Sequence, residues 1–309
     1  MQSFAVGLIA SIVAAMKLSY SLDQLRFSGD QSFKISKAPT HVKKLYKDEA
    51  HYQTLLTEYR NEITELQEKL YAHHRYGVCF IFQAMDAAGK DGTIKHVLSG
   101  IDPQGVEVHA FKKPTDDELD HDYMWRCSQR MPPRGRIGIF NRSYYEEVLI
   151  CQVHPEFINQ YQRLPAEESK DLGKLMDNRR KDIKRFESYS HRNGMRIVKF
   201  MLNVSKDEQK KRFLERIDTP AKNWKFNAAD VKERSKWSEY QKAYELAINA
   251  TASEKCPWYV IPADDKKNMR LIVSAAILHE MKRLQLHWPK LPPEQQAELA
   301  QCKELLLNE

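Results

Sequence analysis

The sequence predicts an α/β fold of three layers, in which a central parallel β-sheet of about five strands lies between helices. Short apolar runs, typical of strands that are buried on both faces, recur along the 309-residue chain. Segments with helical spacing of their apolar residues separate these runs, which is the alternation that βαβ units produce. The composition shows no break that would mark a boundary, so a single domain is expected over residues 31–290.

The elements are expected in a regular order. An amphipathic helix over residues 46–74 leads directly into a buried strand at 76–82. Further strands are expected at 106–111, 136–140, 196–204 and 258–262. The helices between them are predicted over 93–100, 117–130, 144–152, 167–191, 206–216, 228–250 and 267–286.

The two ends of the chain lie outside this pattern. Residues 1–30 are expected to be an extended or disordered leader. The first sixteen residues are apolar or small and lack a preceding positive charge, which does not fit a secretory signal. They are also fewer than the ~20 residues that a membrane-spanning helix needs. Residues 291–309 are expected to form a helical tail, for which packing on a second subunit is one option.

The composition narrows the class of protein. A hydrophobic fraction of 42% and a charged fraction of 29% exclude a largely disordered or fibrous chain. Five scattered cysteines without a CxxC pair argue against a disulfide framework or structural zinc and favour a reducing, cytoplasmic compartment. The net charge of +7 indicates an anionic partner, which nucleic acid, a membrane surface or a phosphorylated substrate would each satisfy.

The loop after the first long strand has the features of a phosphate-binding loop. Residues 84–93 read AMDAAGKDGT and lie between a strand and a helix. In this context backbone N–H groups bind phosphate and Lys90 neutralises the transferring group. Ala84 replaces the first glycine of the common motif, Asp91 follows the lysine, and an ordinary βα turn is the alternative. The other residues expected to bind phosphate or nucleotide here are Ala88, Gly89, Asp91, Gly92 and Thr93.

Asp86 adds a carboxylate inside this loop. A carboxylate repels phosphate unless a cation lies between them, so Asp86 predicts bound Mg²⁺ or Mn²⁺. An Asx-turn or a helix cap is the alternative. Asn141 and Arg142 follow a second strand, where Arg142 can bind phosphate with two hydrogen bonds. Glu146, one turn into the next helix, is expected to complete the metal site or hold the acceptor, although an ordinary helix start would look the same.

These segments together resemble the polyphosphate kinase 2 family. The resemblance is carried by AMDAAGKDGT at 84–93, IFNRSYYEE at 139–147 and RIDTPAKNWKF at 216–226, and it covers about residues 30–290. It implies a P-loop kinase-like fold and phosphate transfer between inorganic polyphosphate and nucleotides. Asp86 and Lys90 correspond to the family's Walker A residues and Asn141 falls on its Walker B segment, where many members have Asp. Asn141 together with Glu146 resembles the subgroup called class III, which accepts both AMP and ADP.

The resemblance also implies a helical lid at about residues 205–245. Arg212 and Arg216 are four residues apart and share a helix face. With Lys225 they are the candidates to contact the transferring phosphoryl group, although a solvated helix with interleaved charges is the alternative. Residues 179–199 hold eight basic and two acidic residues, a net charge of +6. They predict a binding track for polyphosphate through Arg179, Arg180 and Lys181.

The sequence therefore predicts an Mg²⁺-dependent phosphotransferase. Polyphosphate would be the donor in a reversible in-line transfer. ADP is the expected acceptor, AMP is a second one, and guanine nucleotides are a further option. A homo-oligomer, dimer or tetramer, is expected, with neither nucleic acid nor membrane as a partner. One alternative is an ATP-dependent nucleoside or nucleotide kinase. Another is a polyanion-binding protein without turnover, for which Asp86 in the phosphate loop would have little use.

Overall fold

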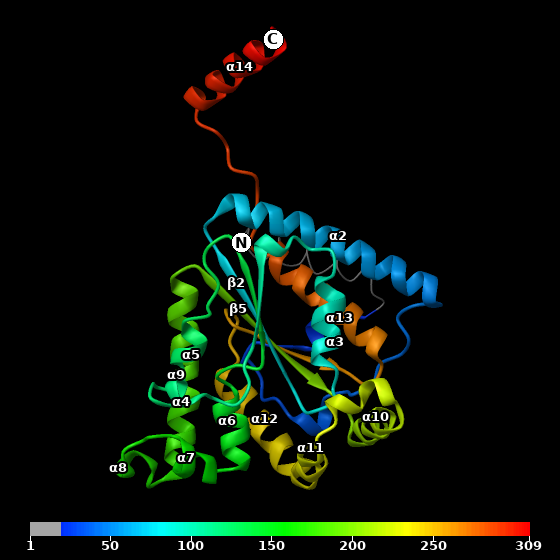
Figure 1. Cartoon of the computed structure of the whole chain (residues 1–309), viewed down its shortest axis with the longest axis vertical. Coiled ribbons are helices and arrows are strands. Elements are labelled where there is room, and N and C mark those ends of the chain that lie inside the picture. The colour runs from blue at the N-terminus through cyan, green and yellow to red at the C-terminus, as the bar shows by residue number, and fades with distance from the viewer. Residues whose placement is uncertain (1–19) are drawn as a thin grey trace.

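The computed structural model describes residues 20–309, except for the side chain of Lys225, and it is built around one six-stranded sheet (Figure 1). The strand order is β1-β6-β5-β2-β4-β3. The pairings within β2 to β6 are parallel, and β1 joins β6 in antiparallel orientation. This confirms the predicted parallel sheet. The strands are β1 (Arg26–Phe27), β2 (Gly77–Ala84), β3 (Val106–Ala110), β4 (Ile137–Asn141), β5 (Met195–Asn203) and β6 (Trp258–Pro262).

Helices pack in two groups, which gives the predicted three layers (Figure 1). One group joins α2, α3 and α13, and the other joins α6, α9 and α12. The helices are α2 (Glu49–His73), α3 (Lys90–Leu98), α4 (Asp116–Leu119), α5 (Trp125–Ser128), α6 (Glu146–Val153), α7 (Glu156–Tyr161), α8 (Ala166–Ser169), α9 (Leu172–Arg192), α10 (Lys206–Asp218), α11 (Ala228–Glu233), α12 (Trp237–Thr251), α13 (Lys266–Lys282) and α14 (Pro293–Leu307). Short 3₁₀ turns lie at η1 (Leu22–Gln24), η2 (Ile35–Lys37), η3 (Pro103–Gly105), η4 (Pro220–Lys225) and η5 (Arg234–Lys236).

The central strand β2 is buried along its whole length, because helices cover both faces of the sheet. Phe82 of β2 stacks on Phe200 of β5, with ring centroids 4.9 Å apart. β2 lies between β5 and β4, and Phe82 is paired in register with Asn141. The loops that follow β2 and β4 therefore begin side by side at the carboxyl edge of the sheet, where open α/β folds bind ligands.

Three expectations about the elements were wrong. Leu22 and Leu25 are buried and β1 extends the sheet, so residues 20–30 belong to the folded body and not to a leader. The remainder of the expected leader lies outside the described residues. The helix expected over 117–130 is two short helices, α4 and α5, because the Asp122 side chain accepts from the N–H of Met124 and starts a new turn. The helix expected over 228–250 is likewise divided into α11, η5 and α12.

The tail forms the predicted helix, α14, and every one of its residues is exposed. Figure 1 shows it projecting from the body at the end of an extended segment. Across residues 20–309, the structure contains no helix with the length and apolar character needed to cross a membrane.

Candidate active site

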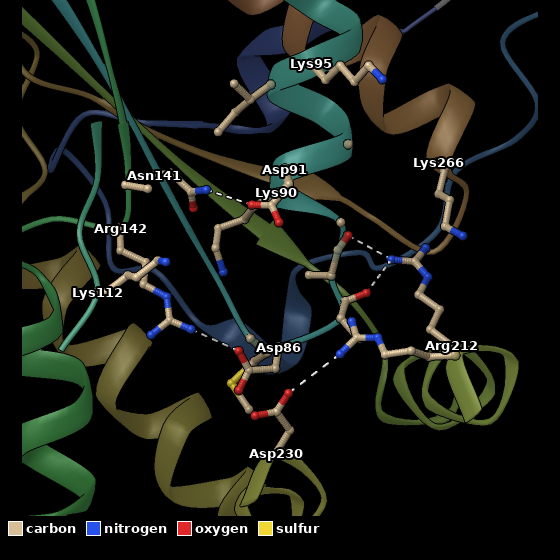
Figure 2. Close-up of a pocket in the computed structure, with 18 of the residues that line it drawn as sticks. Asp86, Lys90, Asp91, Lys95, Lys112, Asn141, Arg142, Arg212, Asp230 and Lys266 are labelled. Carbon is tan, nitrogen blue, oxygen red and sulfur yellow. Dashed lines mark hydrogen bonds and ion pairs between the residues drawn. The ribbon is translucent and has the colours of Figure 1, made fainter. Parts of the chain in front are cut away.

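A cavity of about 890 Å³ lies at the carboxyl edge of the sheet, and the phosphate loop forms one wall (Figure 2). The loop after β4 and the segment after β3 form the opposite wall, and α10 with α11 borders the cavity from below. Ten of the residues predicted from the sequence line it: Asp86, Ala88, Gly89, Lys90, Asp91, Gly92, Asn141, Arg142, Arg212 and Arg216.

The phosphate loop owes its shape to two left-handed residues. Ala87 has φ +59° and Gly89, the N-cap of α3, has φ +101°. This backbone starts α3 at Lys90, so the positive end of the helix dipole points into the cavity. Thr93 lies behind the loop instead: it is fully buried, and its N–H and hydroxyl both donate to Gly89 O. The predicted contact between Thr93 and phosphate is therefore wrong.

Lys90 lies at the centre of the site's electrostatics. Its Nζ donates to Ala84 O at 3.0 Å, which folds the side chain back along the loop. Burial, with a smaller contribution from Arg142, lowers the pKa of Lys90, while Asp86 and Glu146 oppose that shift. The ammonium group thus lies among charges of both signs, at the place where a phosphate group would meet the loop.

Arg142 connects the two predicted metal-binding carboxylates. Its backbone is left-handed, with φ +65°, and its guanidinium binds Asp86 Oδ1 and Glu146 Oε2, each at 3.1 Å. Glu146 raises the pKa of Arg142, whereas burial raises the pKa of the Glu146 carboxyl. Within residues 20–309 there is no group of three or more His, Cys, Asp or Glu side chains placed to hold a metal.

The hydrogen bond that Asn141 makes explains why an amide fits at position 141, where a carboxylate is more common. Its Nδ2 donates to Asp91 Oδ1 at 2.7 Å (Figure 2). Asp91 occupies the position after the lysine, and a second carboxylate at 141 would face it at this distance without a proton to share. The amide therefore lets the Walker A and Walker B segments meet with no cation between them.

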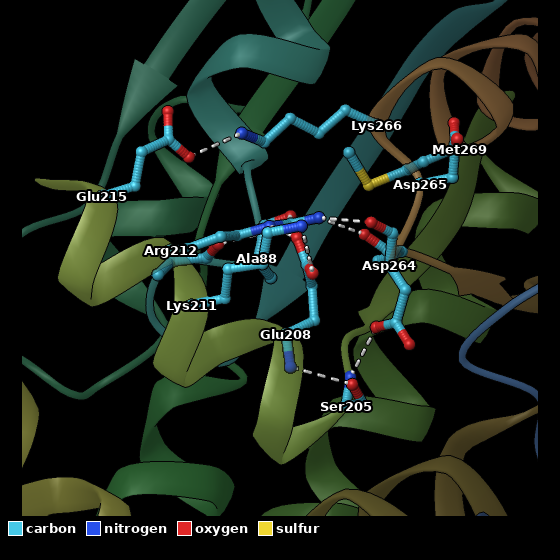
Figure 3. A network of polar contacts seen from close by, with 12 residues as sticks. Ala88, Ser205, Glu208, Lys211, Arg212, Glu215, Asp264, Asp265, Lys266 and Met269 are labelled. Carbon is cyan, nitrogen blue, oxygen red and sulfur yellow. Dashed lines mark hydrogen bonds and ion pairs between the residues drawn. The ribbon is translucent and has the colours of Figure 1, made fainter.

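The two lid arginines have different surroundings. Arg212 is buried, and its guanidinium donates to backbone carbonyls and to Glu208 (Figure 3). Arg216 approaches Asp230 of α11 at 3.6 Å. The side chain of Lys225, the third predicted lid contact, lies outside the described structure.

Asp230 was not identified from the sequence. Burial, and then the charge of Asp86, raise the pKa of Asp230. Nothing in the pattern of α11 marks this residue, because its position depends on how the folded chain brings α11 to the cavity. A group of lysines was missed as well, although Lys112 and Lys113 follow a strand end that could have indicated them. The missed lysines that line the cavity are Lys95, Lys112, Lys113, Lys222 and Lys266.

The predicted polyphosphate track is wrong for two of its three residues. Arg179 binds Glu147 at 3.2 Å and Arg180 binds Asp177 at 2.6 Å, and both arginine side chains are less than one-tenth exposed. Because both side chains are buried and bound by protein acceptors, they do not offer a surface to a polyanion. Lys181 remains on the surface, where it borders a shallow depression of about 280 Å³ with Lys184, Arg185 and Arg192.

The fold and this cavity define a phosphate-binding α/β protein of the P-loop kinase-like class. Residues 46–288 match the model of the polyphosphate kinase 2 family, and the chain belongs to that family.

Known relatives agree with this assignment along most of the chain. The chain is 50% identical to an ADP-polyphosphate phosphotransferase of Rhodopseudomonas palustris, over 92% of this chain and 98% of the relative. It is 41% identical to an AMP/ADP-polyphosphate phosphotransferase of Meiothermus ruber, over 74% of this chain and 80% of the relative. The crystal structure of polyphosphate kinase 2 from Arthrobacter aurescens TC1 superposes with a TM-score of 0.81 at 38% identity, covering 93% of this chain and 98% of that one.

Proposed function

We propose that this protein transfers the terminal phosphoryl group of inorganic polyphosphate to ADP. An oxygen of the ADP β-phosphate attacks the terminal phosphorus, the P–O–P bond to the polyphosphate chain breaks, and ATP leaves with polyphosphate one unit shorter. The reverse reaction uses the same groups. The observation that carries the proposal is the convergence of Lys90, Arg142 and the N-terminus of α3 on one cavity of about 890 Å³. The name of the Rhodopseudomonas relative supports the choice of donor and acceptor.

Different residues at the cavity would perform different parts of such a transfer. Lys90, Arg142 and Arg216 would neutralise the charge of the phosphate groups, and the N–H groups at the start of α3 would orient them. Arg142 is held ready by Asp86 and Glu146, so its guanidinium does not have to be ordered when substrate binds. The lid helices would exclude water, which otherwise competes with ADP as the acceptor.

A divalent cation fits this site through Asp86. Mg²⁺ in phosphotransferases is held by one or two carboxylates together with phosphate oxygens and water, so a large carboxylate cluster is unnecessary. The Asp86 side chain is 34% exposed and lines the cavity, whereas Glu146 is 15% exposed behind Arg142. We assign metal binding to Asp86, with Glu146 as the second carboxylate that orients Arg142. The cation would neutralise phosphate charge and align donor and acceptor.

AMP is the second acceptor that we propose. The Meiothermus relative is named for both AMP and ADP, and the pair of Asn141 and Glu146 is present here. Guanine nucleotides belong in the same test, since a Pseudomonas aeruginosa relative at 32% identity is named a GDP-polyphosphate phosphotransferase.

The deciding experiment incubates the purified full-length protein with polyphosphate, Mg²⁺ and ADP, AMP or GDP, and measures the nucleotides by chromatography. We expect ATP from ADP and a slower appearance of ADP and then ATP from AMP. Omission of polyphosphate or addition of EDTA should abolish both. Failure to form ATP, combined with ADP formation from ATP and a nucleoside, would identify a nucleoside kinase instead. Polyphosphate binding without any turnover would identify a binding protein.

A further inference from the structure

The outer side of the phosphate loop is held by donors from one helix, α10. Gln209 Nε2 donates to Asp86 O at 2.8 Å. Arg212 Nη1 donates to the next two carbonyls, Ala87 O at 3.1 Å and Ala88 O at 2.8 Å. Three consecutive carbonyls of the loop are therefore bound by two side chains that lie three residues apart on α10.

Arg212 also joins this loop to a second one. Its Nη2 donates to Ala263 O at 2.6 Å and Asp264 O at 3.0 Å, both in the segment between β6 and α13, and its Nε donates to Glu208 at 2.8 Å (Figure 3). A guanidinium has five N–H groups, and these bonds together with the two to the phosphate loop engage all of them. The side chain is 5% exposed. Its donors are thus directed to four backbone carbonyls and one carboxylate of the protein, and not to a ligand in the cavity.

The direction of these carbonyls determines the direction of the N–H groups. A loop binds an anion when successive N–H groups point inward, and this requires its carbonyls to point outward. In this loop Ala87 holds the left-handed conformation without being a glycine, a conformation that persists only where surrounding contacts enforce it. Gln209 binds the carbonyl of Asp86, just before Ala87, and Arg212 binds the carbonyls of Ala87 and Ala88.

We propose that Arg212, together with Gln209, is a positioning residue that keeps the phosphate loop in its anion-binding shape, and that it does not bind the transferring phosphoryl group. This replaces the role expected from the sequence, in which Arg212 and Arg216 both contact phosphate. Arg216, one turn further along α10, lines the cavity near Asp230 and retains that role. The proposal rests on the proposed function for its kinetic test but not for its structural one.

Substitutions of Arg212 can separate the effect of its positive charge from the effect of its hydrogen-bond geometry. Lysine keeps the positive charge, but its single nitrogen cannot bridge the two loops as the planar guanidinium does. If Arg212 only positions the loop, Arg212→Lys should be as harmful as Arg212→Met. If it binds phosphate, lysine should rescue much of the activity. Gln209→Met is the second, milder variant, because an uncharged amide contributes nothing to charge neutralisation.

The kinetic test measures kcat, the KM for polyphosphate and its salt dependence, with each kcat divided by the fraction of sites that bind ADP in calorimetry. We expect kcat to fall about 100-fold in Arg212→Lys and Arg212→Met and about 10-fold in Gln209→Met. The KM and the slope of log KM against log salt should stay near the wild-type values. Lys210→Met, an exposed control on the same helix, should leave all three unchanged. Near-normal kcat in Arg212→Lys, or a flatter salt slope in Arg212→Met, would overturn the proposal.

The structural test uses hydrogen exchange of the ligand-free protein, read on peptides that cover residues 84–93. Exchange there should accelerate in Arg212→Met and Gln209→Met, while peptides from α2 and β5 keep their wild-type rates. Unchanged exchange at 84–93 would refute the proposal that Arg212 and Gln209 hold the phosphate loop in shape. This measurement needs no substrate, so its outcome does not depend on the activity. A wild-type protein without polyphosphate activity would refute the proposed function, and the hydrogen-exchange result would still decide the role of Arg212.

Discussion

Basic side chains lie both around the phosphate loop and along helix α9, but the structure uses them in opposite ways. Around the loop, Lys90 and Arg142 face a cavity. On α9, Arg179 turns inward to the buried Glu147, and Arg180 is bound by Gln152 of α6 and by Asp177 of its own helix. A count of basic residues therefore does not locate an anion site. What matters is whether the side chain is open to a cavity, as Arg142 is, or buried against protein acceptors, as Arg179 is. This comparison makes separate predictions for the two regions.

Substitution at Lys90 should have the largest effect on activity. Lys90→Met removes a buried cation from the point where phosphate meets the loop, and we expect kcat to fall about 1,000-fold or more. The fold should persist, because the substitution removes the hydrogen bond from the ammonium group to the carbonyl of Ala84 and replaces the side chain with one of similar length. Steady-state kinetics with polyphosphate and ADP, alongside circular dichroism, measures both effects. Activity within about 10-fold of wild type would show that the charge of Lys90 is not required.

Substitution at Arg179 should instead affect stability. Arg179→Met leaves the Glu147 carboxylate buried without its partner, and we expect the free energy of unfolding to fall by about 3 kcal/mol. The matched control is Lys181→Met on the exposed side of the same helix, which should change it by about 0.5 kcal/mol or less. Urea unfolding measures both. If Arg179→Met raised the KM for polyphosphate and left stability unchanged, the buried assignment would be wrong.

Asp86 tests the metal assignment within the cavity. Asp86→Asn keeps the size of the side chain and the contact with Arg142 through its oxygen, but it removes the charge that would hold Mg²⁺. We expect a fall in kcat of about 100-fold and a higher Mg²⁺ concentration for half-maximal activity. A titration with Mg²⁺ at fixed substrate concentrations measures this shift. An unchanged Mg²⁺ requirement would assign the carboxylate to loop structure alone.

These contrasts also show how much of the fold and of the site could be predicted from the sequence. Strands β2 to β6 were predicted to within two residues at each end, because buried strands form continuous apolar runs, whereas the two-residue strand β1 was not predicted. The phosphate loop was predicted because all its parts are adjacent in the chain. Arg212 and Arg216 could not be separated, since they share a helix face and differ only in the acceptors that the folded chain brings to each. Asp230, on a lid helix with no motif of its own, became visible only through its distance to Arg216.

The remaining surface of α9 offers a smaller test of the same comparison. Lys181 and Lys184 are exposed and border a shallow depression, outside the main cavity. If charge there only attracts polyphosphate from a distance, the double variant Lys181→Gln and Lys184→Gln should raise the KM by about twofold at low salt and have no effect at high salt. A larger effect that persisted at high salt would show direct binding and restore part of the predicted track.

The smallest expected effect concerns His154, which joins α6 to the lid helix α11. Burial lowers the pKa of His154, but hydrogen bonds to Glu233 and Glu156 outweigh this, and the pKa is raised above its ordinary value of 6.5. The folded protein therefore holds this proton more tightly than the unfolded chain. The resulting stabilisation is fully present below the unfolded pKa and is lost as the pH rises through the folded pKa. The melting temperature of the wild type should exceed that of His154→Gln at about pH 5.5, and this difference should shrink as the pH rises to about 8.5. A constant difference would show that the pKa of His154 is the same in the folded and the unfolded chain, so that the two carboxylates do not stabilise its charged form.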